Sequence, residues 1–502
     1  MYLMGIDVGT TGCKVIVFNL KGRIIARAYR SYDLQLPHAG WRELDPREVA
    51  DAVFSCVRVC CQNNVGQQVA ALSISAQGEA LVPVDREGSA LANSIVSFDT
   101  RNCEEVTWLR ENIDLSYTIK KTGVPLHTMF SVAKLIWIKK HTPEVYEKTW
   151  KFLCFAGYVA LLLGAPAVMD YSLASRTMMF DVIGNQWDRK IIDDCGLDAE
   201  KLPQLQPSGT MIGTIDRQVA THLGLNPSTA IVCGGHDQVC CALGAGILQS
   251  GVAMNSMGTT DSIVCVNNAF TSGMQQITSN IPCGAYPISG LYANHSFVLS
   301  TGTVLQWFKE NFCQRKEYSF RELDSMAAQR LGPTGLFFMP HFSGSGTPYL
   351  DSNSKGALMG LTLDTGWAEI YKAILEGNNY EIKLNICNME RAGIMIDTVR
   401  CIGGAAKSDI YLQIKANILD KPVVKLVLEE AGCLGAALLA GVGCGIITNI
   451  RDTIGDFVCE EKVFLPQPDY SGAYQEHFEK YRMIYGFIHE IYTPYEKEKS
   501  LC

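Results

Sequence analysis

This sequence of 502 residues lacks an excess of positive charge and has few charged residues of either sign. Lysine and arginine number 43 against 51 aspartate and glutamate residues, which gives a formal net charge of −8. A protein dedicated to nucleic acids needs a basic surface that neutralises phosphates, so we expect no nucleic-acid partner. Hydrophobic residues make up 47% of the chain and charged residues 19%, which excludes a disordered, solvated polymer.

A membrane-spanning run and a cleavable leader are also missing. The longest apolar run, residues 431–447, has 17 residues with five glycines, which is short for a membrane span and predicts a closely packed helix followed by a turn. Residues 1–7 enter a strand-like apolar run without a basic segment or a cleavage site. We therefore expect no membrane partner and a cytoplasmic location.

The 19 cysteines include no pair with the spacing Cys-x-x-Cys. Their odd number and irregular spacing argue against a disulfide framework or a zinc site, so we expect buried, reduced thiols. A chain of this length can bury large cores without such cross-links, in two or three domains.

A short internal repeat divides the chain. Residues 9–11 and 258–260 both read Gly-Thr-Thr, and β-branched, apolar segments flank each copy. Such a pattern predicts two tight hairpins and a duplicated two-domain architecture. Helical and strand patterns alternate elsewhere, as in the expected strand at 69–75 and the expected helix at 409–419, which favours an α/β fold with mixed sheets. We place the boundary near residue 246, between domains 1–246 and 247–502.

The two turns could hold phosphate groups. Successive small residues at 9–12 direct several backbone N–H groups into one concavity, with hydroxyls on Thr10 and Thr11 and a positive charge on Lys14. Asp7 beside such a site indicates a cation such as Mg²⁺ between carboxylate and phosphate. An ordinary hairpin with a turn aspartate is the alternative for residues 7–14, and a plain turn is the alternative for 258–261.

Two further segments could carry chemistry. Asp237 follows an expected strand at 230–232 and begins a helix, where it could be an N-cap or a general base that accepts a hydroxyl proton. We expect the adjacent His236 to be a hydrogen-bonded local residue rather than the base. Gly403 and Gly404 join a strand to a helix, where close backbone approach to a phosphorylated ligand and a plain connection are both open.

Taken in order, these motifs resemble the FGGY carbohydrate kinases, which include the xylulose, glycerol, gluconate and ribulose kinases. The resemblance runs from residue 3 to roughly residue 470 and includes further matching stretches at 134–139, 170–181, 343–351 and 374–377. It implies a two-domain actin/hexokinase-like (ribonuclease H-like) α/β fold. Each domain would contain a mixed five-stranded sheet, and the domains would close over ATP and a sugar in an interdomain cleft.

The resemblance also implies roles for individual residues, with ATP and Mg²⁺ as cofactors. Asp237 would be the general base, and Asp7 would orient Mg²⁺ and the γ-phosphate. The residues implied in nucleotide binding are Asp7, Thr10, Thr11, Lys14, Gly258, Thr259, Thr260, Gly403, Gly404, Ala405 and Lys407.

The acceptor is less closely defined by the sequence. In xylulokinases the positions that match Gly78 and Glu79 are Met-His, whereas glycerol kinases have Arg-Glu; a glutamate suits a polyol because one carboxylate accepts from two adjacent hydroxyls. Ser97 stands where many relatives have tryptophan, which predicts a roomier or more polar pocket. The expected substrate-binding residues are Gln77, Gly78, Glu79, Asp99 and Gln238.

The spacing of these motifs along the chain is most similar to that in xylulokinase-like members of the family. We therefore predict ATP-dependent phosphorylation of a ketopentose such as xylulose. The alternatives are a kinase of a polyol or sugar acid (glycerol-, erythritol- or gluconate-like) and a non-catalytic sugar- or nucleotide-binding protein on the same fold. The sequence does not decide which hydroxyl is phosphorylated, how the protein is regulated, or whether it forms a homodimer.

Overall fold

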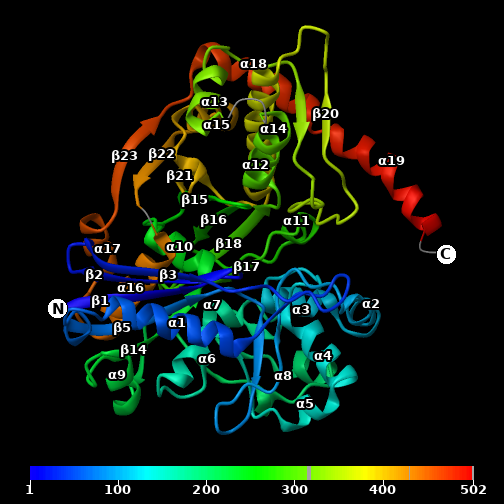
Figure 1. The fold of residues 1–502 in the computed structure, drawn as a ribbon. Helices are drawn as coiled ribbons and strands as arrows, with labels where there is room; N and C mark the ends of the chain where they lie inside the picture. The colour runs from blue at the N-terminus through cyan, green and yellow to red at the C-terminus, as the bar shows by residue number, and fades with distance from the viewer. Residues whose placement is uncertain (314–317, 429, 500–502) are drawn as a thin grey trace.

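Two mixed β-sheets, one in each half of the chain, organise the protein (Figure 1). The structure is a computed structural model that describes residues 1–313, 318–428 and 430–499. The first sheet has the order β13-β14-β5-β1-β2-β3, with bounds β1 (Tyr2–Val8), β2 (Gly12–Asn19), β3 (Ile24–Ser31), β5 (Val69–Ala76), β13 (Met211–Thr214) and β14 (Ala230–His236). The second has the order β17-β18-β16-β15-β21-β22-β23, with bounds β15 (Gly251–Met257), β16 (Asp261–Asn267), β17 (Cys283–Ala285), β18 (Tyr292–Val298), β21 (Ile396–Ile402), β22 (Val423–Val427) and β23 (Cys459–Phe464).

The two sheets repeat one topology. In the first, β1 pairs antiparallel with β2 and parallel with β5; in the second, β15 pairs antiparallel with β16 and parallel with β21. The internal duplication predicted from the repeated Gly-Thr-Thr is confirmed at this level. The expected number of five strands per sheet is wrong, because the sheets that the structure describes have six and seven strands. Strands β13 and β23 each add an antiparallel strand at the equivalent edge of their sheet, and β17 adds a further strand to the second sheet.

Helices cover the sheets and connect their strands. The larger ones are α1 (Pro46–Cys60), α2 (Cys103–Asn112), α3 (Leu115–Thr122), α4 (Ser131–His141), α6 (Phe155–Leu162), α10 (Asp237–Gly244), α12 (Thr301–Phe312), α13 (Phe320–Ala327), α14 (Trp367–Arg391), α15 (Asp409–Leu419), α16 (Ala431–Gly443), α18 (Pro468–Tyr481) and α19 (Ile484–Lys499). Shorter helices are α5 (Pro143–Lys148), α7 (Tyr171–Ala174), α8 (Arg189–Asp194), α9 (Arg217–Leu223), α11 (Met274–Thr278) and α17 (Ile450–Thr453).

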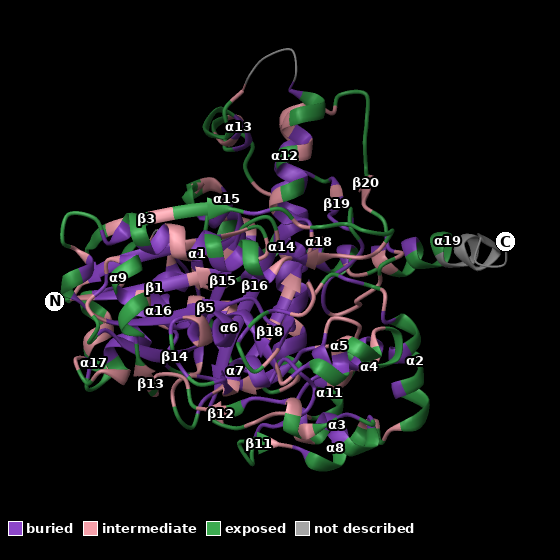
Figure 2. Ribbon diagram, turned by 60° about the horizontal axis from the view of Figure 1, so that its bottom comes forward, coloured by how far each residue is buried: buried purple, intermediate pink, exposed green. Residues whose placement is uncertain are grey.

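Local sequence explains why these elements begin where they do. The Asp45 side chain accepts a hydrogen bond from the Arg47 N–H at 2.9 Å, and Pro46 takes the first position of α1, where a missing N–H costs nothing. Val49 and Val53 are fully buried on the face of α1 that packs on the first sheet. Figure 2 shows the same division over the whole protein, with buried residues in the sheets and exposed ones on outer helix faces.

Two helices cross between the halves. Helix α10 follows β14 of the first sheet, yet Leu243 packs among residues of the second sheet such as Val264. Helix α16 follows β22 of the second sheet, yet Leu438 packs against Leu3 of the first, and Figure 1 shows α16 beside β1 and β5. The boundary near residue 246 stays a proposal. Helix α10 comes before residue 246 in the sequence but packs on the second sheet, and α16 comes after it but packs on the first.

Helices α10 and α16 touch through glycines. A Cβ on Gly435 would lie 2.0 Å from the Cys240 carbonyl oxygen, and one on Gly244 would lie 2.1 Å from the Ala431 carbonyl oxygen. The glycine-rich run at 431–447 is therefore a packed helix, as predicted. Within the part of the chain that the structure describes, no helix combines the length and apolarity needed to cross a membrane.

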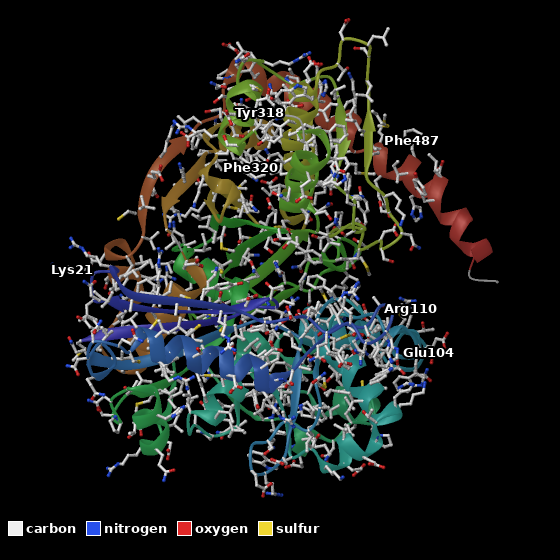
Figure 3. All side chains as sticks on the ribbon, in the orientation of Figure 1. Lys21, Glu104, Arg110, Tyr318, Phe320 and Phe487 are labelled. Atoms are coloured by element: carbon white, nitrogen blue, oxygen red, sulfur yellow. The ribbon has the colours of Figure 1, made fainter. Side chains whose placement is uncertain are left out.

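The C-terminal helix α19 leaves the body of the second half, as Figures 1 and 3 show, and the exposed Phe487 marks it. The cysteines that the structure describes are all free and most are buried, as the sequence predicted.

Candidate active site

The parallel strands of the first sheet bring the expected functional residues to one edge. Asp7 is in register with Ser75 between β1 and β5, and Gly235 of β14 pairs with the same serine. The carboxyl ends of these strands therefore lead directly into the turn at 9–12, the loop at 77–80 and Asp237. Residues separated by more than 200 positions meet here because of parallel pairing alone.

The first turn, residues 9–12, is fixed by contacts from its outer side. The Gly9 carbonyl oxygen accepts from the Tyr32 hydroxyl at 2.5 Å and from the Gln77 side-chain amide at 3.3 Å. Thr10 donates its hydroxyl to Gln77 Oε1 at 3.1 Å, while Thr11 is exposed. Gln77 thus links the first turn to the expected sugar loop, and the turn's shape is set before a ligand binds.

Asp7 and Asp237 influence each other across this edge. Burial raises the pKa of Asp7, although its Oδ1 accepts from the Ser75 hydroxyl at 2.8 Å. Burial, followed by the charge of Asp7, raises the pKa of Asp237 to about 8. Asp237 accepts from the N–H of Gln238 and is not an N-cap, because it is the first residue of α10 and His236 precedes the helix. These surroundings fit a divalent cation at Asp7, the expected ligand, and a proton-accepting role for Asp237.

His236 is held as a neutral local residue. The residue is 6% exposed, its backbone N–H donates to the Ser172 hydroxyl at 2.9 Å, and its Nε2 lies 3.3 Å from Asp237 Oδ1. Burial, with the nearby Arg176 charge, holds the pKa of His236 well below its usual range. These contacts support the expectation that it is not the general base.

Lys14 has a partner that the sequence did not predict. The sequence places its charge beside the first turn, but the Nζ forms an ion pair with Glu430 Oε2 at 2.7 Å. Lys14 lies in β2, where it pairs with Asp7 of β1, and Glu430 lies just before α16. The ion pair therefore joins β2 of the first half to the second half. Lys14 therefore reaches a phosphate only by sharing or leaving Glu430, a partner that no local pattern reveals.

The second turn, residues 258–260, lies against two other segments of its half. The N–H of Gly302, at the start of α12, donates to the Thr259 carbonyl oxygen at 3.2 Å. Gly403 has φ +94°, and a Cβ there would lie 2.5 Å from the Met257 carbonyl oxygen, which only glycine permits. The structure thus brings together the turn with Thr260 and the expected adenosine-side residues Gly403 and Gly404, with Ala405 and the exposed Lys407 following.

The N-terminus of α12 was missed by sequence reasoning. It contacts the second turn through Gly302 and Thr303, whose hydroxyl donates to the Thr259 carbonyl oxygen at 3.3 Å. The signal that could have found it is the run Ser-Thr-Gly-Thr at 300–303, directly before an amphipathic segment.

The expected acceptor residues divide into two groups. Gly78 and Glu79 lie beside His236 and Arg176. Gln238 lines a small cavity together with His236 and Arg176, and the Gln238 Oε1 is buried without a hydrogen-bond partner. Asp99 forms the second group, and its role stays a prediction. Its fully buried carboxylate accepts from the Arg42 N–H and from the Arg101 guanidinium, so both oxygens are engaged in this structure.

A cavity of about 20 Å³ lies between the halves beside these residues, with room for roughly one water molecule. Arg176, His236 and Gln238 line it from the first half, and His295 from the second. The His295 Nε2 is buried without a partner. Sequence reasoning missed Arg176 and His295, since an isolated arginine or histidine outside a recognised motif carries no positional signal.

The donor set fits a magnesium nucleotide. Asp7 supplies a hard oxygen ligand, and Mg²⁺ is commonly held by one or two carboxylates together with phosphate oxygens. The close backbone approaches at Gly302 and Gly403 leave a surface without side chains around the second turn. In the described ranges no group of three or more histidine, cysteine, aspartate or glutamate side chains is arranged to hold a metal by itself.

Comparisons with known proteins agree with this geometry. Residues 2–244 match the model of the N-terminal domain of the FGGY family of carbohydrate kinases, and residues 253–444 match the model of its C-terminal domain. A xylulose kinase of Bacillus subtilis is 28% identical over 494 residues, 98% of each chain. A glycerol kinase of Bacillus anthracis is 31% identical over 481 residues, 93% of this chain and 94% of that one.

A solved structure of a gluconate kinase from Lactobacillus acidophilus superposes with a TM-score of 0.91, at 25% identity, covering 98% of this chain and 99% of that chain. The expected two-domain kinase fold is therefore confirmed. The three relatives are named for a ketopentose, a polyol and a sugar acid, so similarity alone leaves the acceptor undecided.

Proposed function

We propose that this chain, which belongs to the FGGY family of carbohydrate kinases and is a sugar kinase, transfers the γ-phosphoryl group of ATP to a ketopentose such as xylulose. The observation that carries the catalytic assignment is Asp237, a carboxyl group with a pKa of about 8 that begins α10 at the carboxyl end of β14, within the electrostatic influence of Asp7. The similarity to xylulose kinases over nearly the whole chain supports the ketopentose.

In this proposal Asp237 accepts the proton of the acceptor hydroxyl while that oxygen attacks the γ-phosphorus. The bond between the γ-phosphorus and the bridging oxygen breaks, and ADP leaves with the electron pair. A pKa near 8 suits this task because the base must be strong enough to take a hydroxyl proton and still be partly ionised at neutral pH.

The remaining residues bind and orient. Asp7 would hold Mg²⁺, which supplies positive charge to the transferring phosphoryl group. Thr10, Thr11 and Lys14 would bind phosphate oxygens from the first half, and Gly258, Thr259 and Thr260 from the second. Gly403, Gly404, Ala405 and Lys407 would contact the adenosine side. Closure of the halves would exclude water and limit ATP hydrolysis.

A polyol is the second candidate acceptor. Glu79 places a carboxylate at the acceptor loop, and a glycerol kinase is 31% identical to this chain. Its oxygens already accept from Arg176 and Ser97, so substrate hydroxyls would share them through the remaining lone pairs. Gln77, Gly78 and Gln238 would line the acceptor site in either case. Asp99 acts through Arg101 and is a positioning residue in this proposal.

An ADP-release assay with xylulose, glycerol and gluconate tests the function. We expect acceptor-dependent ADP release, and we expect Asp237→Asn to lower kcat by about 10²- to 10⁴-fold while ATP binding persists, since this is the usual contribution of a general base. Asp181→Asn is the matched control, because it removes a carboxylate from the Lys121 ion pair in the same half. Full activity of the Asp237 variant would refute the assignment, and ATP or sugar binding without any ADP release would favour the non-catalytic alternative.

A further inference from the structure

We infer that the ion pair of Glu79 and Arg176 is a charge-selectivity element that admits a neutral polyhydroxylated acceptor and rejects a sugar acid. This inference rests on the proposed function and adds the charge class of the acceptor to it. It also assigns Arg176 as a specificity-determining residue of this site.

The pair is buried and its geometry is defined. Arg176 Nε donates to Glu79 Oε1 at 2.5 Å, and Nη2 contacts the same oxygen. The other oxygen, Oε2, accepts from the Ser97 hydroxyl at 2.8 Å. Glu79 is 4% and Arg176 8% exposed, and the guanidinium lies 5.1 Å from the ring centre of Phe130. The arginine that lines the cavity therefore already has its countercharge.

Glu79 is held in an unfavourable backbone conformation. Its φ is +62°, a region that side-chain-bearing residues seldom adopt. Its carbonyl oxygen accepts from the Ser131 hydroxyl at 3.1 Å and from the buried Lys134 Nζ at 3.2 Å. Contacts to both its backbone and its carboxylate thus fix one orientation, and such over-determined strain concentrates at functional sites.

Gly78 makes room for this arrangement. A Cβ at residue 78 would lie 2.7 Å from His236 Cδ2 and 3.2 Å from Arg176 Cγ. The imidazole and the arginine stem therefore occupy the space beside the loop into which a side chain at 78 would project. The arginine partner for Glu79 comes from a segment almost 100 residues later in the chain.

The remaining groups at the cavity add hydrogen bonding without net charge. The rings of His236 and His295 lie 6.2 Å apart, and burial keeps the pKa of each well below its usual range. The unpartnered His295 Nε2 and Gln238 Oε1 can each bond a substrate hydroxyl. Hydroxyls can both donate to Glu79 and accept from Arg176, whereas a carboxylate brought here meets the negative charge of Glu79. Arg176 is already paired with Glu79, and the nearby Lys134 is buried, donates to the Glu79 carbonyl oxygen and does not line the cavity.

Binding and turnover with xylulose, glycerol and gluconate test the inference separately from the reaction. We expect at least one neutral acceptor, and not gluconate, to raise the Tm of the wild-type protein, and kcat/KM for that neutral acceptor to exceed that for gluconate by about tenfold or more. Glu79→Gln keeps the shape but leaves the guanidinium unpaired, so the preference should shift toward gluconate by about tenfold or more. The double variant with Arg176→Gln restores neutrality and should reverse that shift.

Asp181→Asn is the control for loss of a buried carboxylate elsewhere and should keep the wild-type preference. Arg176→Gln alone leaves the Glu79 charge unbalanced and should weaken gluconate further, which gives a second test if Glu79→Gln fails to fold. Wild-type protein that binds gluconate as well as the neutral acceptors, or charge variants that fold and keep the wild-type ratio, would overturn the inference. Selective Tm shifts without ADP release would support it while removing the kinase proposal.

Discussion

Lys14 and Glu430, 416 positions apart, form an ion pair of 2.7 Å that joins the first hairpin to the start of α16. The pair lies where the carboxyl ends of the two sheets meet, and both side chains remain about one-third exposed. It connects the halves at the point where the proposed nucleotide phosphates would bind.

The first prediction concerns this pair. Glu430→Gln should change the free energy of unfolding by less than about 1 kcal/mol, because exposed ion pairs contribute little. It should lower the KM for ATP by a few fold, since Lys14 no longer needs to be shared with a carboxylate. Lys14→Met should raise that KM, and Lys190→Met, which breaks the exposed pair with Asp194, should leave it unchanged. An unchanged KM in both Glu430→Gln and Lys14→Met would contradict a phosphate role for Lys14.

The second prediction is a pH profile. Burial, with the charge of Asp7, raises the pKa of Asp237 to about 8, so most of this carboxyl group is protonated at neutral pH in the free protein. The base is active when ionised, and kcat/KM for ATP reports the free protein. We expect it to rise about tenfold per pH unit below 8 and to level off above, for wild type and Asp181→Asn alike. A flat profile between pH 6 and 9 would argue against Asp237 as the base.

The third prediction concerns stability. The native pKa of Asp237 lies above the unfolded value of about 3.9, so its protonated form stabilises the native state and this contribution is lost as pH rises from about 4 through about 8. Asp237→Asn should therefore be neutral at pH 4 and stabilising by on the order of 5 kcal/mol above pH 8, measured by urea unfolding. Adding Asp7→Asn should give less than the sum of the two effects, because each removes the same repulsion. Additive effects would show that the carboxylates do not interact.

The fourth prediction compares two glycines. Gly435→Ala places a methyl group 2.0 Å from the Cys240 carbonyl oxygen at the crossing of α10 and α16, so it should destabilise by about 2–3 kcal/mol. Gly472→Ala lies in α18 with open space around it and should stabilise by about 0.5–1 kcal/mol. Urea unfolding measures both. Equal changes in the free energy of unfolding at the two positions would contradict the prediction, because they would mean that α10 and α16 can move apart to accept the methyl group.

Local sequence patterns determined the secondary structure that surrounds the site. The Asp45-Pro46 pair predicted the start of α1, the glycine-rich run predicted a packed helix, and the two Gly-Thr-Thr turns predicted equivalent hairpins. Each of these depends on interactions within about 15 residues, such as a cap, a periodicity or a turn, which is why the order of amino acids reveals them.

Tertiary structure decided which charges meet. Glu430 opposite Lys14, Arg176 on Glu79 and Arg101 on Glu43 are contacts between a charged group and a partner set by chain topology and burial. No local pattern encodes them, because a buried charge takes whatever countercharge the fold brings near it, at any separation in sequence. The sequence by itself therefore determined two equivalent glycine–threonine turns and a duplicated α/β architecture, and it predicted a candidate base. Only the tertiary structure decided which of the expected binding groups are already paired.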